Sequence, residues 1–147
     1  MLTQKEADEL INLIKILLEY KSIAIPIMGD QKKVVLKDKE SGKIRFTVDM
    51  QRKSYNIHKI TYQTRINSEI LLRLDIEGPP HPNPDGTEID GPHIHIYREG
   101  CSDSWAYPLN DVIQTDQTDL AKVLVDFLKY NHVENIPEIT FQGGENI

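Results

Sequence analysis

The chain has 147 residues, a net charge of −6 at pH 7 and one cysteine. This length predicts a single domain over 1–147 with a core of its own. No apolar run approaches the roughly 18 residues of a membrane span, and the segment 10–18 lacks the flanks of a signal peptide, so we expect no membrane partner. The lone Cys101 excludes an internal disulfide and favours a cytoplasmic location.

The charge is unevenly distributed along the chain. Residues 31–75 hold eleven Lys and Arg against five Asp and Glu, whereas residues 76–147 hold three against thirteen. The middle of the chain can present a basic face to phosphate groups, and the acidic part would repel them. The alternative is that these charged residues are ordinary solvent-exposed side chains on strand faces and bind nothing.

The first elements are a helix and an irregular strand. Thr3 and Glu6 have the spacing of a capping box, which predicts a helix over 4–20. Its apolar residues recur at helical spacing: Ala7, Leu10, Ile11, Ile14, Leu17 and Leu18. The extended segment 22–28 contains Pro26, which favours an edge or irregular strand.

A meander of strands is predicted next, at 33–37, 43–50, 54–62, 69–76, 93–98 and 104–108. Alternation is clearest in the second, which places Ile44, Phe46, Val48 and Met50 on one face. In the third, Tyr55 and Ile57 are expected on one side. The proline-rich segment 77–92 is expected to be a shaped loop.

A last helix is predicted over 117–131, with a loosely packed tail at 133–147. The helix has one apolar stripe: Leu120, Val123, Leu124, Phe127 and Leu128. The order predicts an α+β fold with an N-terminal helix, a five- or six-stranded mostly antiparallel meander and a C-terminal helix. The helices are expected to cover one face of the sheet.

A cluster of polar side chains is predicted at one end of this sheet. Alternation along 93–98 places His93, His95 and Tyr97 on one face and two isoleucines on the other. If 69–76 and 93–98 pair as antiparallel neighbours, Arg73 and Asp75 share that face. His81 would approach from the loop 77–92.

Two chemistries fit this set of residues, and a structural role is the alternative to both. Two histidines can act as general base and general acid while an arginine holds a phosphate, which suits metal-free RNA cleavage by a 2′-hydroxyl. Alternatively, His93 and His95 can bind zinc or another divalent metal, with His81 or a carboxylate completing the site. In the structural role, the histidines only hydrogen-bond loop carbonyls.

The sequence resembles a known but uncharacterised family of small bacterial and phage proteins, a domain of unknown function. The resemblance rests on TQKEADELI, TYQTR, RLDIEGPPHPNPDG, PHIHIYREG and SDSWAYPL. A looser similarity connects Arg-x-Asp, Pro-His and His-x-His to ribonuclease toxins of mobile elements related to RelE and barnase. That similarity implies a helix-plus-meander fold and RNA as the substrate.

Three functions are therefore expected, in this order. The first is a metal-independent endoribonuclease of toxin type. In it His93 and His95 supply the general base and acid, Arg73 holds the phosphate, Asp75 orients an imidazole, Tyr97 donates a hydrogen bond, and His81 assists. The second is a non-enzymatic acidic phage protein that binds a basic host defence protein. The third is a metal-dependent hydrolase that uses the three histidines. The sequence leaves the oligomeric state open.

Overall fold

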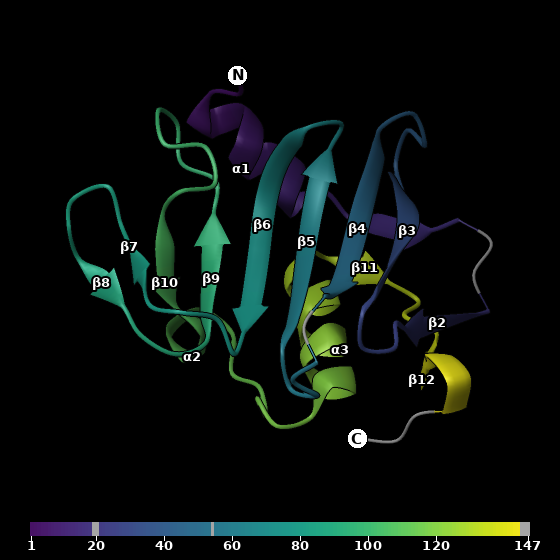
Figure 1. The fold of residues 1–147 in the computed structure, drawn as a ribbon. Helices are drawn as coiled ribbons and strands as arrows, with labels where there is room; N and C mark the ends of the chain where they lie inside the picture. Colours follow the sequence, from purple (N-terminus) through teal and green to yellow (C-terminus); the bar gives the residue numbers. More distant parts are fainter. Residues whose placement is uncertain (19–20, 54, 145–147) are drawn as a thin grey trace.

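The computed structural model describes residues 1–18, 21–53 and 55–144. Its largest element is a mostly antiparallel eight-stranded sheet with the order β10-β9-β6-β5-β4-β3-β1-β11 (Figure 1). In chain order its strands are β1 (Lys15–Leu17), β3 (Asp30–Asp38), β4 (Arg45–Arg52), β5 (Ile60–Ile66), β6 (Glu69–Ile76), β9 (His93–Ile96), β10 (Ala106–Pro108) and β11 (Val133–Glu134). The described α-helices are α1 (Gln4–Asn12), α2 (Leu109–Val112) and α3 (Leu120–Tyr130). The α+β prediction is confirmed, with more strands than expected.

One face of the sheet packs against the helices and forms the core. Alternate residues of β3 to β6 are buried there, as the period-2 pattern predicts. Figure 1 shows α1 and α3 on the same side of the sheet. The apolar stripe of α3 is buried against it, and the Tyr62 hydroxyl donates to the Leu120 carbonyl at 2.9 Å. The other face of β3, β4 and β5 carries polar side chains.

The first helix is shorter than the predicted 4–20. The capping box forms at Thr3, but the helix ends at Asn12, and β1 follows. The apolar run after Asn12 suits a strand as well as a helix, and pairing with β3 and β11 decides the outcome. Ile14 is exposed rather than part of a helical stripe. Residues 19 and 20 lie outside the described residues.

A buried lysine joins the ends of the two long helices. The Lys15 ammonium donates to the carbonyl oxygens of Ile11, Leu13 and Asn131 at 2.9, 3.0 and 2.7 Å. The last carbonyls of a helix carry partial negative charge, which a cation complements. Lys15 therefore fixes the point at which the chain leaves α1 and enters the sheet.

The strand predicted at 54–62 begins late. β5 starts at Ile60, and Tyr55 and Ile57 are exposed, so their expected place on a strand face is wrong. Residue 54 lies outside the described residues. β5 extends to Ile66, beyond the predicted end at residue 62, because it pairs with β4 and β6 over this length.

The expectation of a loosely packed tail is also wrong over the described residues. β11 pairs in parallel with β1, and β12 (Glu138–Phe141) pairs in parallel with β2 (Ser22–Ile25). The 3-10 helix η1 (Gln142–Gly144) follows, and residues 145–147 lie outside the described residues. These short strands find partners that are far away in the sequence, which local pattern does not reveal.

The proline-rich segment 77–92 is ordered around a small hairpin. Its strands β7 (His81–Pro82) and β8 (Glu88–Ile89) pair with each other beside β10. Over the described residues, no helix is long and apolar enough to span a membrane.

Candidate functional site

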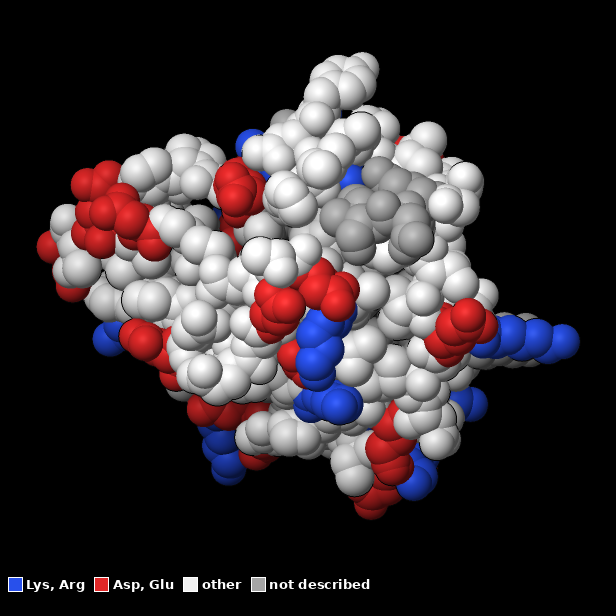
Figure 2. Space-filling model, turned by 90° about the horizontal axis from the view of Figure 1, so that it is seen from below, with Lys and Arg blue, Asp and Glu red and all other residues white. Residues whose placement is uncertain are grey.

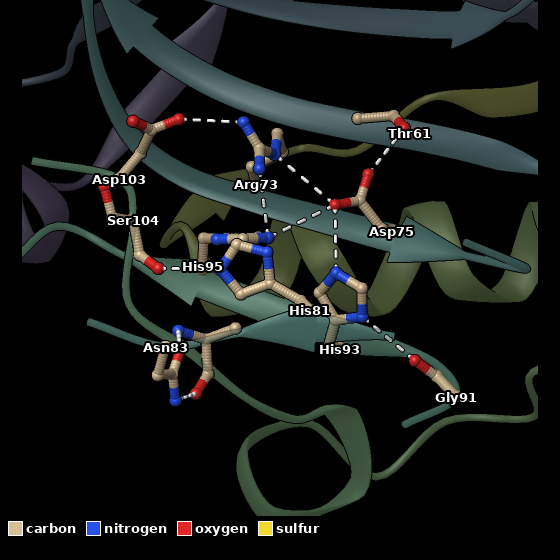
Figure 3. Close-up of polar contacts among 11 residues, drawn as sticks. Thr61, Arg73, Asp75, His81, Asn83, Gly91, His93, His95, Asp103 and Ser104 are labelled. Carbon is tan, nitrogen blue, oxygen red and sulfur yellow. Dashed lines mark hydrogen bonds and ion pairs between the residues drawn. The ribbon is translucent and has the colours of Figure 1, made fainter. Parts of the chain in front are cut away.

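Two neighbouring strands place four of the predicted residues together. β6 and β9 pair antiparallel in a register that sets Arg73 opposite His95 and Asp75 opposite His93. Because side chains alternate along each strand, all four lie on the sheet face away from α1 and α3. The predicted pairing of these two segments is confirmed. We call these four residues and His81 the histidine cluster (Figure 3).

Asp75 is the hub of the histidine cluster. Its Oδ2 lies 3.3 Å from His93 Nε2 and 3.4 Å from His95 Nε2, and Thr61 Oγ1 donates to Oδ1 at 2.6 Å. Burial alone would raise the pKa of Asp75, but the contacts with His93, His95 and Thr61 and the charge of Arg73 hold it well below its ordinary value. Asp75 is therefore a carboxylate at neutral pH.

Arg73 supplies the positive charge of the site. Its Nη1 donates to Asp103 Oδ2 at 2.8 Å, its Nη2 lies 3.0 Å from His95 Nε2, and its Nε lies 3.4 Å from Asp75 Oδ2. Asp103 comes from the turn before β10, so Arg73 connects that turn to the sheet (Figure 3). Nothing in the local pattern around Asp103 marked it in advance.

The two strand histidines are in different environments. His93 Nδ1 lies 2.9 Å from the Gly91 carbonyl, which can only accept, so this nitrogen carries a proton. A second proton on Nε2 then satisfies Asp75. Accordingly, the hydrogen bond to Asp75 raises the pKa of His93, and burial offsets only part of this effect. His93 is thus disposed to be an imidazolium.

His95 is disposed to be neutral. Its Nε2 faces the Arg73 guanidinium, which can only donate, so Nε2 acts as an acceptor. Its Nδ1 is buried, with no hydrogen-bond partner among the described residues. Burial lowers the pKa of His95, and Arg73 lowers it further, against the opposite influence of Asp75. The same carboxylate thus faces one histidine that favours a proton and one that resists it.

His81 lies over this pair, as the sequence suggested. Its ring meets His95 edge-on at 4.5 Å between centroids and stacks with His93 at 5.8 Å. Its Nε2 lies 2.8 Å from the Ser104 carbonyl, which can only accept, so that nitrogen carries a proton. The hairpin of β7 and β8 therefore delivers a third imidazole to the site.

Asn83 anchors that hairpin, and sequence analysis missed it. Its side-chain amide donates to the Ala106 carbonyl at 2.9 Å and accepts from the Ala106 N–H at 2.7 Å. The amide thus pairs with the backbone of β10 as a neighbouring strand would. The Asn-Pro dipeptide indicates only a turn, so its partner follows from the tertiary structure.

Tyr97 does not join the histidine cluster, so its predicted place is wrong. β9 ends at Ile96, and the Tyr97 hydroxyl donates instead to the Leu2 carbonyl at 2.6 Å. Its ring is buried in the core. The alternation that placed it beside the histidines stops where the strand stops.

The histidine cluster forms the floor of an open cavity of about 370 Å³. Both strand histidines, His81 and the Arg73–Asp75 pair line it. So do groups from neighbouring elements: Gln51, Lys59, Thr61, Gln63 and the segment 78–80. His95 is only 1% exposed and His93 4%, so a ligand reaches them past His81 and Arg73.

The same part of the site brings together three side chains of metal-binding type. One ligand atom each from Asp75, His93 and His95 lies within 4.8 Å of the others, so the third member of this set is a carboxylate and not His81. Separations of 3.3 and 3.4 Å from the carboxylate suit tetrahedral ligands at about 2.0–2.1 Å from one ion. However, Arg73 Nη2 already uses the lone pair of His95 that an ion would need. The guanidinium fills the place of a cation, so the arrangement as it stands does not fit a metal.

The fold and the site together define an α+β protein with a histidine–aspartate–arginine cluster on the open face of its sheet. The chain belongs to a family of unknown function (DUF6978), whose model matches residues 2–133. That range contains every residue of the histidine cluster but not β12. No curated protein and no solved structure matches the chain. The chemistry must therefore be argued from the site itself.

Proposed function

We propose that this protein is a metal-independent endoribonuclease that cleaves RNA by attack of a ribose 2′-hydroxyl on the adjacent phosphate. The observation that carries the proposal is the convergence of two imidazoles and one guanidinium around a single carboxylate on a cavity floor. This reaction needs a base for the 2′-hydroxyl, an acid for the 5′-oxygen and a cation for the phosphate. The histidine cluster contains one of each.

The environments suggest which histidine has which role. The neutral His95 takes the proton of the 2′-hydroxyl at Nε2 while the oxygen attacks phosphorus. The imidazolium of His93 gives its Nε2 proton to the departing 5′-oxygen, so the products are a 2′,3′-cyclic phosphate and a 5′-hydroxyl. Arg73 faces the charge that develops on the phosphate. Solvent then returns both imidazoles to their starting protonation.

The proposal requires a rearrangement at the mouth of the cavity. His95 is almost fully buried, and the Arg73 guanidinium occupies the approach to its Nε2. A phosphate is a stronger partner for that guanidinium than a neutral imidazole, so substrate would draw Arg73 off His95 and free the base. Asp75 keeps His93 protonated through Nε2 until that proton passes to the departing 5′-oxygen, and the Gly91 carbonyl holds the ring by Nδ1.

The test is cleavage of single-stranded RNA by purified protein in EDTA, with analysis of the product ends. We expect cyclic phosphate ends, and a rate about 10² to 10⁴ lower in His93→Asn and His95→Asn. His132→Asn is the matched control, because His132 is exposed, lies outside the cavity and has a positive φ of 60° that Asn tolerates. Circular dichroism melts must show that the variants fold.

Three results would overturn the proposal. Cleavage that EDTA abolishes and zinc restores would identify the protein as a metal-dependent hydrolase. Cleavage that is equal in the cluster variants and in wild type would indicate a contaminating nuclease. No cleavage in either condition would leave the acidic protein that binds a basic partner as the better account.

A further inference from the structure

The open face of the sheet carries two rows of polar side chains that lead away from the histidine cluster. The strand register places His93, Asp75, Thr61, Gln51 and Gln31 in one row. It places His95, Arg73, Gln63, Asp49 and Lys33 in the other. From β9 to β3 the rows cross four strand spacings, or about 19 Å.

The surface along these rows has three neighbouring hollows that share lining residues. The cavity over the histidine cluster is followed by hollows of about 360 and 410 Å³, and Gln51 lines all three. Gln63 is shared with the larger of the two, and Lys59 and Thr61 with the smaller. The three hollows therefore form one shallow channel over β5, β4 and β3.

The channel carries uncompensated positive charge. Beyond the histidine cluster, the carboxylate that lines the channel is Asp49, which is neutralised by Arg65 Nε at 2.7 Å and also accepts from Gln63 at 2.9 Å. Four lysines line the hollows, and none has an ion pair among the described residues: Lys32, Lys33, Lys53 and Lys59. Of the two on β3, Lys33 belongs to the rows on the open face. The glutamine amides between them offer neutral donors.

The opposite side of the histidine cluster is acidic. Asp85, Glu88 and Asp90, in and beside the β7–β8 hairpin, are exposed. Figure 2 shows acidic side chains gathered on the side of the molecule where Figure 1 places that hairpin. A polyanion that reaches the histidines is thus repelled on one side and attracted on the other.

We propose that the channel over β5, β4 and β3 binds single-stranded RNA, with Lys33, Lys53 and Lys59 contacting successive phosphates on one side of the scissile bond. This inference rests on the proposed function and adds to it the direction and the extent of the substrate. The channel is shallow and its lining is polar rather than aromatic, so recognition is of the backbone and not of base identity.

The test measures binding separately from cleavage. A fluorescent single-stranded RNA with 2′-O-methyl riboses lacks the nucleophile and cannot be cut, so anisotropy reports binding alone. The triple variant Lys33→Gln, Lys53→Gln, Lys59→Gln is compared with a control that removes the same charge from helix surfaces, at Lys5, Lys122 and Lys129. Both triple variants have the same net charge.

Each phosphate contact on a single strand contributes about 0.7 to the slope of log affinity against log salt, so the channel variant should lose about 2 from that slope. At about 0.1 M salt this corresponds to roughly 100-fold weaker binding. The control should bind like the wild type. Equal weakening of both variants, or no binding of the wild-type protein, would overturn the inference.

The outcomes also separate this inference from the proposed function. If binding depends on the channel lysines but ordinary RNA is not cleaved, the channel is supported and the nuclease activity is refuted. If the channel variant cleaves RNA as efficiently as the wild type, the nuclease activity is supported and the role of the channel is refuted. Tighter binding to duplex than to single strands would refute the assignment of the occupant.

Discussion

Asp75→Asn is the substitution that tests whether one carboxylate holds the histidine cluster together. The Asp75 side chain is 19% exposed and faces Arg73, His93 and His95 while accepting from Thr61. Removal of one partner from a buried charge network costs about 3–5 kcal/mol. For a chain of this length we therefore expect the melting temperature to fall on the order of 10 °C.

Urea denaturation at neutral pH measures this loss, with Glu134→Gln as the control. Glu134 pairs with Lys39 at 2.6 Å on the surface, and such a pair contributes at most about 1 kcal/mol. An Asp75→Asn protein as stable as the wild type, or more stable, would refute the reasoning. It would mean that the carboxylate is kept there at a cost to stability.

The pH dependence of this loss has a definite sign. The pKa of Asp75 is lower in the folded protein than its ordinary value of about 3.9, so its contribution to stability is complete above that value. The contribution decreases as the pH falls further. The stability difference between wild type and Asp75→Asn should therefore be smaller in acid than at neutral pH. A difference that stays constant would show that it is not electrostatic.

Three further predictions follow from particular contacts. In an NMR titration, the pKa of His93 should lie above the ordinary value of about 6.5, and that of His95 should lie below it. Asp75→Asn should lower the pKa of His93. A higher pKa for His95 than for His93 would contradict the assigned roles. Tyr97→Phe should lose about 0.5–1.5 kcal/mol of unfolding free energy in urea with no change in RNA cleavage, because its hydroxyl donates to the Leu2 carbonyl and not to the histidine cluster. A loss of RNA cleavage would show that Tyr97 belongs to the site. Asn83→Ala should speed proteolysis within 81–89, because the hairpin loses its attachment to β10. An unchanged rate of proteolysis would show that Asn83 does not anchor the hairpin.

The sequence was informative wherever local pattern and packing agree. The alternation in 43–50 and 69–76 identified buried strand faces, because a sheet with one covered face imposes a period of two. The capping box located the start of α1, and the apolar stripe located α3. The sequence pattern failed at 13–18, where an apolar run suits helix and strand alike. It also failed at 55–59, which pair with no strand in the described part of the chain.

For the site, the sequence determined the residue types and their spacing, and therefore that Arg73, Asp75, His93 and His95 share a face once their strands pair. It did not determine that Asp75 bridges both histidines, that Asp103 holds Arg73, or that Asn83 docks the hairpin carrying His81. Most of these contacts join residues that are 20 or more positions apart in the sequence. The energy of each contact depends on a distance and a degree of burial that exist only in the folded chain. The contrast between the two histidines has the same origin. The two imidazoles differ in their tendency to hold a second proton. His93 faces the Gly91 carbonyl through Nδ1, whereas His95 faces the Arg73 guanidinium through Nε2.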